Sequence, residues 1–328
     1  MTEQALPITA GDRGDSVRAL HERLAAAGVP PGGDPHVIDA HTRLAVRGFL
    51  AWRRLRVDGV VARQTWGALV ESDYRLGDRM LYRRAPMTRG DDVTELQWRL
   101  GSLGFDAGYV DGIFGPDTER AVRAFQANQA VTPDGVVGPD TVAALGRLAG
   151  RRSGEKTIAE VREAELLRAQ SGLRSRRLVV GQAGGVSDLV EALADRLRAA
   201  GAEVLALHHR DLSTQARTAN EWDGAIYLGI AVADDEPSIA YFQTEGFVSY
   251  GGRGLAAHTS EAITTVMGRS HPAVGMRIPI LRETRMPAVW CRVALGDQVD
   301  GQAASLAVAL EAALTTWCDA PEHTFGSA

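Results

Sequence analysis

The 328-residue chain has little of several features that would narrow its class. Its two cysteines, Cys291 and Cys318, are too few for a disulfide framework. A formal net charge of −5 provides no basic footprint for nucleic acid. The N-terminus lacks the basic and apolar regions of a secretory signal, and no apolar run reaches the roughly 18 residues that a membrane span needs. We therefore expect a cytoplasmic protein with no membrane span.

The composition is otherwise that of an ordinary folded protein. Hydrophobic residues make up 45% of the chain and charged residues 23%, which is typical of soluble globular domains. The length exceeds that of a typical single domain. The chain can therefore hold two or three domains.

Two segments of the N-terminal half repeat one another. The tripeptide Arg-Gly-Asp at residues 13–15 recurs at residues 89–91, an offset of 76 residues. The same offset relates Val17 to Val93, Leu20 to Leu96, Leu24 to Leu100, Phe49 to Phe125 and Leu69 to Leu145. So many coincidences in one register indicate an internal duplication.

Each copy is predicted to form three short helices. In the second copy Val93, Leu96 and Leu100 form an apolar stripe at helical spacing. Pro116 suits the first turn of the next helix, and the pair at residues 134–135, Asp-Gly, is a turn former. We expect one repeat over residues 10–72 and the other over residues 86–149.

The second copy resembles the type 1 peptidoglycan-binding domain through its segments 89–93, 109–116 and 133–138. The resemblance implies a sugar-peptide ligand, and Tyr109, Asp111 and Phe114 are the candidate ligand-binding residues; packing and turn formation are the alternative roles. The first copy has Pro35 to Asp39 where the second has its Asp-Gly turn. We therefore expect a degenerate first repeat.

From residue 176 to residue 318 strand and helix patterns alternate. After a first strand and a glycine-rich turn, strands are expected at residues 203–207, 225–230 and 288–293, an edge strand pair within 239–250, and helices at 188–200, 254–267 and 301–317. This alternation predicts an α/β fold, a mixed twisted sheet with flanking helices. A linker and short helix are expected over 150–175 and a mobile tail over 319–328.

The glycine-rich turn after the first strand, Gly-Gln-Ala-Gly-Gly at residues 181–185, resembles the first signature of the type 3 N-acetylmuramoyl-L-alanine amidases. In that family a histidine, a glutamate and a second histidine bind zinc, and a later glutamate is catalytic. The flanking motifs place Ala183, Val186 and Ala231 at the three ligand positions. The motif that begins at Pro287 places Arg292 at the position of the catalytic carboxylate.

None of these four side chains can coordinate zinc, and an arginine cannot act as a base at neutral pH. The resemblance therefore implies a pseudoenzyme with no metal and no other cofactor. A relocated site at His208 and His209 is the alternative, but neighbouring residues on a strand point to opposite faces. Cys291 is expected to be a packing residue rather than a nucleophile.

The order of domains, with an amphipathic run at residues 161–168, resembles a subgroup of actinobacterial proteins in which two such repeats precede an amidase domain. The resemblance implies a regulator of cell-wall precursor synthesis. The implied partners are a peptidoglycan fragment or precursor, UDP-N-acetylglucosamine enolpyruvyl transferase, and a Ser/Thr protein kinase acting near the C-terminus, for which Thr324 is the candidate. An active zinc amidase and a non-catalytic wall-binding protein remain as alternatives.

Overall fold

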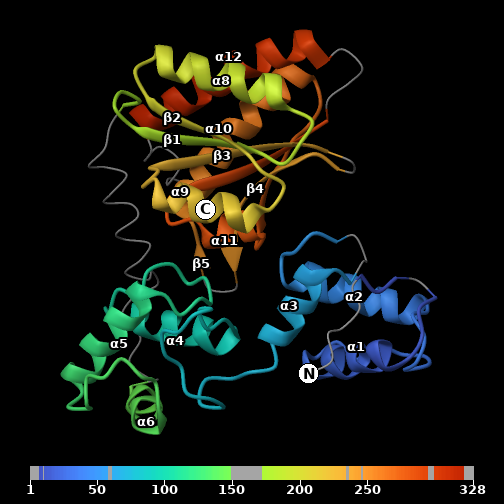
Figure 1. Cartoon of the computed structure of the whole chain (residues 1–328), viewed down its shortest axis with the longest axis vertical. Helices are drawn as coiled ribbons and strands as arrows, with labels where there is room; N and C mark the ends of the chain where they lie inside the picture. Colours follow the sequence, from blue (N-terminus) through green and yellow to red (C-terminus); the bar gives the residue numbers. More distant parts are fainter. Residues whose placement is uncertain are drawn as a thin grey trace. The chain divides into compact units, whose positions relative to one another are not determined.

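The computed structural model describes residues 7–9, 11–57, 61–148, 172–233, 236–244, 247–294 and 299–320. The chain forms two compact units, residues 1–159 and 160–328 (Figure 1). Separate clusters of buried apolar side chains form the cores of these units. The expected helix within residues 150–171, the mobile tail beyond residue 320 and Thr324 lie outside the described residues. Those expectations, and the finer domain bounds, stay predictions.

The first unit contains the two predicted repeats, and each forms three helices. Repeat one has α1 (Asp15–Ala26), α2 (Ala40–Trp52) and α3 (Arg63–Glu71), and repeat two has α4 (Asp91–Ser102), α5 (Pro116–Asn128) and α6 (Pro139–Arg147). Every helix of repeat two begins and ends 76 residues after its counterpart in repeat one. The three-helix prediction is confirmed, down to Pro116 in the first turn of α5.

Each repeat closes around its own apolar core. In repeat two Val93, Leu96 and Leu100 are fully buried, as their spacing predicted, against Val122 and Phe125 of α5. Short antiparallel bridges tie the loops together in corresponding places: Arg13 pairs with Val37 in repeat one, and Arg89 pairs with Ile113 in repeat two. The duplication thus extends from the helices to the loops between them.

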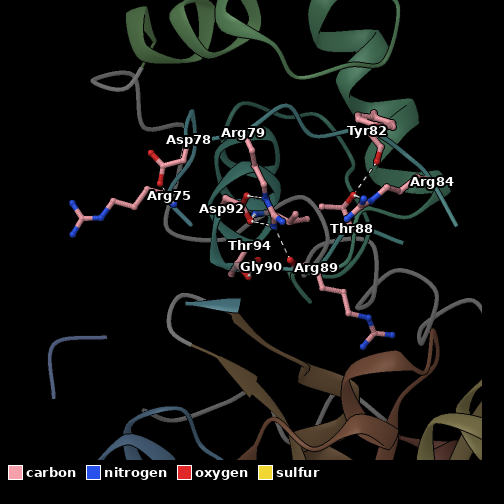
Figure 2. A network of polar contacts seen from close by, with 11 residues as sticks. Arg75, Asp78, Arg79, Tyr82, Arg84, Thr88, Arg89, Gly90, Asp92 and Thr94 are labelled. Atoms are coloured by element: carbon pink, nitrogen blue, oxygen red, sulfur yellow. Dashed lines mark hydrogen bonds and ion pairs between the residues drawn. The ribbon is translucent and has the colours of Figure 1, made fainter. Parts of the chain in front are cut away.

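An ion pair between Arg79 and the buried Asp92 lies beside the Arg-Gly-Asp motif of repeat two (Figure 2). Arg79 Nε donates to Asp92 Oδ2 at 2.7 Å, and Arg79 Nη2 donates to the carbonyl of Arg89 at 2.7 Å. Asp92 is 1% exposed, so its charge needs this partner. A Cβ on Gly90 would lie 2.2 Å from Asp92 Oδ1 and 2.7 Å from Arg79 Nη2. A side chain at residue 90 would therefore force this ion pair to shift.

The second unit is built on one mixed sheet. Its strands are β1 (Arg177–Gln182), β2 (Glu203–His208), β3 (Ile226–Val232), β4 (Ser238–Thr244), β5 (Phe247–Val248), β6 (Ala273–Met276) and β7 (Ala288–Val293). The strand order is β2-β1-β3-β7-β4-β5, with β6 paired to β4. Strands β2, β1, β3 and β7 run parallel, and β4 is antiparallel to β7. The predicted mixed sheet with flanking helices is therefore correct.

Helices cover both faces of this sheet (Figure 1). They are α8 (Ser187–Ala199), α9 (Leu212–Glu221), α10 (Tyr250–Met267), α11 (Pro279–Glu283) and α12 (Val299–Asp319). The larger core joins α8, α10 and α12 to one face, where Leu228, Val289 and Cys291 point. On the other face, Tyr227 Oη of β3 donates to Gln215 Oε1 of α9 at 2.7 Å. The second face is the one that carries the candidate site.

The sequence prediction placed one strand wrongly and missed three elements. The strand pair expected within residues 239–250 is present, because β4 pairs antiparallel with β5, but β4 itself lies inside the sheet, between β7 and β6. Helix α9 was missed because its buried residues are Gln215, Ala216 and Ala219, which give no apolar stripe. Strand β6 and helix α11 were missed because segments of four and five residues are too short for a periodic signal.

Candidate functional site

Three of the four family positions, Ala183, Ala231 and Arg292, lie at one edge of the sheet in the second unit. The parallel strands β1, β3 and β7 all end at this edge. Gln182 is in register with Ile230, so Ala183 and Ala231 follow at the same level on neighbouring strands, and Ala231 is in register with Arg292. In open α/β sheets the carboxyl ends of parallel strands are where ligands bind. The sequence motifs therefore identify a real structural locus.

The side chains at this locus are apolar or cationic. Ala183 and Ala231 are half-buried methyl groups. Val186 is 3% exposed and belongs to the large core of the unit. Arg292 is half-buried, and its Nη1 donates to the carbonyl of Glu236 at 3.3 Å. The locus offers one positive charge and no oxygen, nitrogen or sulfur atom that could accept a metal at the other three positions.

Aromatic side chains fill the face of the sheet one level below this locus. Gly181, Gly229 and Trp290 are register partners on β1, β3 and β7. A Cβ on Gly229 would lie 2.2 Å from Trp290 Cε3, and a Cβ on Gly181 would lie 2.1 Å from Tyr227 Oη. Trp290 is 6% exposed and Tyr227 fully buried. The two glycines let an indole and a phenol lie directly on the strands, and these rings occupy the space beneath the locus.

Burial also decides the protonation state of two groups near this sheet. Loss of solvent raises the pKa of the Tyr227 hydroxyl far above its usual range, so it stays a neutral donor. Burial raises the pKa of the Cys291 thiol in the same way, and Cys291 points into the large core. The predicted packing of Cys291 in the core is confirmed by its full burial.

The two adjacent histidines at the end of β2 have different partners. His208 Nδ1 lies 2.7 Å from Gln182 Nε2, and His208 Nε2 lies 2.7 Å from Glu191 Oε1. His209 Nδ1 instead accepts from the backbone N–H of Asp211 at 3.0 Å. The histidines therefore do not converge on one point. Over the residues that the structure describes, no three His, Cys, Asp or Glu side chains gather in a way that could hold a metal ion.

In repeat two the candidate Asp111 belongs to a turn that a glutamine of α4 holds closed. Asp111 Oδ1 accepts from Gln97 Nε2 and from the backbone N–H of Ile113, each at 2.8 Å. The N–H of Gly112 donates to Gln97 Oε1 at 2.8 Å. Gly112 has φ +72°, a conformation that favours glycine. The buried carboxamide of Gln97 thus bonds both the carboxylate of Asp111 and the N–H of Gly112.

The same arrangement occurs a second time in this repeat. Gln126 of α5 donates to Asp134 Oδ1 at 2.9 Å and to the Thr141 hydroxyl at 3.1 Å, and its Oε1 accepts from Gly135 N at 2.9 Å. Hydrogen bonds from the N–H of Val136 and from Gln126 lower the pKa of Asp134. We name these two arrangements the glutamine latches. Sequence reasoning missed them, although the motif Asp-Gly-x-x-Gly-Pro-Asp-Thr occurs at both 111–118 and 134–141.

The other two candidates of repeat two differ in exposure. Phe114 is fully buried in the core of the repeat, so its ring has no face on which a sugar could stack. The suggestion that Phe114 contacts ligand is therefore corrected to a packing role in this structure. Tyr109 is half-buried, at the surface beside the first latch.

Repeat one has neither glutamine latch. His21 stands where repeat two has Gln97, and its Nε2 lies 2.9 Å from the Thr42 hydroxyl. Leu50 replaces Gln126, and Pro35 replaces Asp111. The residues that hold the turns thus differ between the two repeats, although the helices have the same bounds at the 76-residue offset.

Comparisons with known proteins agree with both halves of this architecture. Residues 13–69 and 89–145 each match the family "Putative peptidoglycan binding domain". The N-acetylmuramoyl-L-alanine amidase CwlM of Mycobacterium tuberculosis is 32% identical over 327 residues, which cover 86% of this chain and 80% of that protein. The N-acetylmuramoyl-L-alanine amidase CwlL of Bacillus licheniformis is 31% identical over 42% of this chain and 44% of that protein. The solved N-acetylmuramoyl-L-alanine amidase AmiC2 of Nostoc punctiforme aligns at 15% identity with a TM-score of 0.36, over 45% of this chain and 98% of that chain.

The duplicated repeat and the mixed sheet thus define an amidase homologue with two peptidoglycan-binding domains. At this identity and coverage, the chain belongs to the family of the N-acetylmuramoyl-L-alanine amidase CwlM. Of the helices that the structure describes, none is long and apolar enough to cross a membrane.

Proposed function

We propose that this chain is a catalytically inactive amidase homologue that acts in the cytoplasm as a regulator of peptidoglycan precursor synthesis. The observation that carries the proposal is the chemistry at the carboxyl edge of the sheet. The positions at which the resemblance expects three zinc ligands and a catalytic carboxylate hold Ala183, Val186, Ala231 and Arg292. The first and the last two of these positions lie on adjacent strand ends.

The zinc ion that the amidase family implies does not fit these residues. A catalytic zinc ion needs three nitrogen, oxygen or sulfur ligands from the protein. Ala183, Val186 and Ala231 supply none, and the nearest charged group, Arg292, only donates hydrogen bonds. A guanidinium stays protonated at every physiological pH, so Arg292 can neither ligate a cation nor take a proton from water. We therefore assign no hydrolytic step to this locus.

Repeat two is the part of the chain to which we assign peptidoglycan recognition. Its two glutamine latches hold both Asp-Gly turns in a fixed conformation. Tyr109 and Asp111 lie at the first turn, where a half-buried ring can stack on a sugar and a carboxylate can accept from a hydroxyl or ammonium group. The ligand we propose is a peptidoglycan fragment or precursor. Repeat one, without either latch, is expected to bind such a ligand weakly or not at all.

The regulatory part of the proposal concerns partners. From the resemblance we propose UDP-N-acetylglucosamine enolpyruvyl transferase as the enzyme that this chain regulates, and a Ser/Thr protein kinase, acting at Thr324, as its own regulator. A phosphate would add nearly two negative charges to the tail and create strong hydrogen-bond acceptors for a basic partner surface. Purified transferase, assayed with and without the chain before and after kinase treatment, tests this. No change in transferase activity in any arm contradicts the partner assignment.

A hydrolysis assay tests the proposed inactivity. The full chain is incubated with purified peptidoglycan fragments and excess Zn²⁺, beside an active amidase as the positive control. We expect no new free amino groups from the chain and normal release from the control. Release that scales with the concentration of this chain, and that stops on chelation, contradicts the proposal.

A further inference from the structure

The exposed side of α2 in repeat one carries an apolar stripe. Leu44 is 71% exposed and Trp52 is 53% exposed, which is unusual for such large apolar side chains. They are eight residues apart, with Gly48 midway, so all three lie along one side of the helix. A Cβ on Gly48 would meet only Val29, at 3.8 Å. Gly48 therefore leaves a shallow notch between the two large side chains.

The stripe is not required by the fold. The 76-residue offset places Arg120, Ala124 and Asn128 of α5 at the positions of Leu44, Gly48 and Trp52. Helices α2 and α5 bury equivalent faces in their repeats, so Arg120 and Asn128 of α5 show that the fold accepts polar side chains at the positions of Leu44 and Trp52. Repeat one thus has two large apolar side chains where its duplicate has two polar ones.

The surroundings of the stripe are strongly basic. Residues 40–57 contain five arginines and no aspartate or glutamate, whereas the matching residues 116–133 contain two arginines and two acidic residues. Arg43 and Arg47 are exposed and lie along one side of the stripe. Neither of their guanidinium groups forms an ion pair within the described part of the chain. Arg53, at the end of α2, is instead held by Asp91 in a bidentate pair with distances of 2.5 and 2.6 Å.

We propose that this surface, formed by Leu44, Gly48 and Trp52 with Arg43 and Arg47 beside them, docks an acidic amphipathic segment of a partner protein. We call it the α2 stripe. Apolar side chains of the segment cover Leu44 and Trp52 and enter the notch at Gly48, as in other helix recognition by i, i+4 anchors. Carboxylates on the flank of the segment pair with Arg43 and Arg47. This site lies on repeat one, so it goes beyond the ligand recognition that we assign to repeat two.

Charge and geometry favour this occupant over two others. In a two-fold contact with a second copy of the chain, Arg43 and Arg47 would face a surface of the same sign, which is unfavourable. A helix that lies in a membrane surface needs a broad apolar face. The broad apolar face of α2, with Val46, Phe49 and Leu50, is already buried in the core of the repeat. One amphipathic segment of a partner protein is narrow enough to match the α2 stripe, which is the apolar surface that remains exposed.

Fluorescence anisotropy with two synthetic helical peptides tests the proposal on the full chain. One peptide carries leucines at helical spacing and glutamates on its flanks, and the other has glutamines in place of the glutamates. We expect the acidic peptide to bind at least about tenfold more tightly than the glutamine peptide, and high salt to remove most of the difference. Equal binding of the two peptides, or no binding of either, overturns the proposal.

Variants with the residues of repeat two locate the site. Leu44→Arg and Trp52→Asn introduce side chains that the same fold carries on α5, and Arg43→Glu introduces the counterpart of Glu119. Each is expected to weaken binding of the acidic peptide about tenfold or more, with an unchanged circular dichroism spectrum. Arg147→Glu makes the same charge change at an exposed residue of α6 and should leave the binding of the acidic peptide unaltered. Equal loss in Arg147→Glu, or none in Leu44→Arg, overturns the proposal.

Two further measurements distinguish the other occupants. Wild-type chain and Leu44→Arg are sedimented over a range of concentrations, and both are mixed with phosphatidylglycerol vesicles. The proposal predicts a monomer in both cases and no vesicle binding that depends on Leu44. Self-association or vesicle binding that Leu44→Arg abolishes replaces the acidic partner with a second copy or a membrane surface.

Discussion

Ala231 on β3 and Arg292 on β7 are register partners on parallel strands, at the edge of the sheet where both strands end. Their side chains emerge on the same face, and Ala183 follows at the same level on β1. The methyl group of Ala231 thus stands between a second methyl group and a fixed positive charge. Two testable consequences concern this sheet, one concerns repeat two and one concerns repeat one.

The register predicts that a metal site can be built at this edge. In Ala183→His/Ala231→His/Arg292→Glu, two imidazoles and a carboxylate replace groups on three neighbouring strand ends about 4.8 Å apart, a spacing that suits zinc chelation. We expect the triple variant to bind Co²⁺ with the strong visible absorption of a tetrahedral site. Ala231→His alone is the control and should bind far more weakly. Equal metal affinity in the two variants contradicts the geometry described for this locus.

Gly229→Ala is expected to destabilise the second unit by about 1–3 kcal/mol, because the new methyl group would overlap the indole of Trp290. Trp290→Leu in the same chain removes that ring and should restore part of the loss. Gly146→Ala, on α6 with no heavy atom within 4 Å of the new Cβ, is the control for glycine replacement itself. Urea unfolding of the wild-type chain, the two single variants, the double variant and the Gly146→Ala control measures the effect. If the losses of unfolding free energy in Gly229→Ala and Trp290→Leu simply add in the double variant, the proposed overlap between the new methyl group and the indole is contradicted.

Gln126→Leu opens the second glutamine latch and should destabilise repeat two. The substitution leaves the buried N–H of Gly135 without its partner, a loss of about 1–3 kcal/mol. It also removes one of the donors to the exposed carboxylate of Asp134, which keeps the hydrogen bond from the N–H of Val136. Leucine is also the residue of repeat one at this position, Leu50, so its size suits the fold. Amide hydrogen exchange at the 134–136 turn should accelerate in Gln126→Leu and stay unchanged in the exposed control Asn128→Ala. Unchanged exchange in both variants contradicts the latch.

The stability of repeat one should fall in mild acid because of His21. Burial lowers the pKa of His21 below its usual 6.5, so the unfolded chain binds this proton more readily than the folded chain does. The free energy of unfolding therefore decreases as the pH falls from about 6.5 towards the lower pKa of the folded state. His21→Gln, which introduces the residue of repeat two, removes this contribution. Urea midpoints of both chains on either side of about pH 6.5 test this.

His271 provides the internal comparison for that experiment. Burial also lowers the pKa of His271, which lies in the second unit, so its acid sensitivity should persist in His21→Gln. Tryptophan fluorescence reports on both units, and hydrogen exchange separates them. An identical pH dependence of repeat one in the wild-type chain and in His21→Gln contradicts the role assigned to His21.

Much of the fold could be predicted from apolar spacing. The repeats, their three helices and the long helices of the second unit follow from stripes such as that of Val93, Leu96 and Leu100, because burial of one face imposes the helical period. The interior position of β4 could not be predicted. Strand order depends on contacts between segments far apart in sequence, and β4 pairs with β7 and β6, which follow it by tens of residues.

The candidate site could be predicted from the sequence only in part, for a similar reason. Motif flanks located Ala183, Ala231 and Arg292, and the parallel register brings them together. The glutamines of the latches gave no signal of their own, because a single Gln97 on a helix has the pattern of any solvent-exposed residue. Phe114 is a candidate ligand contact from its place beside an Asp-Gly turn, with packing as the alternative, and its ring lies in the core. Side-chain direction after a turn depends on backbone angles that sequence spacing does not report.

The most direct test of the central claim is the zinc content of the purified full chain. The chain is equilibrated with excess Zn²⁺, freed of unbound metal and measured by mass spectrometry of the metal, beside the triple variant Ala183→His/Ala231→His/Arg292→Glu. The account predicts a negligible zinc-to-protein ratio for the natural chain and a ratio near unity for the variant. A stoichiometric zinc ion in the natural chain that survives dialysis, and that is lost together with amidase activity on chelation, would contradict the account.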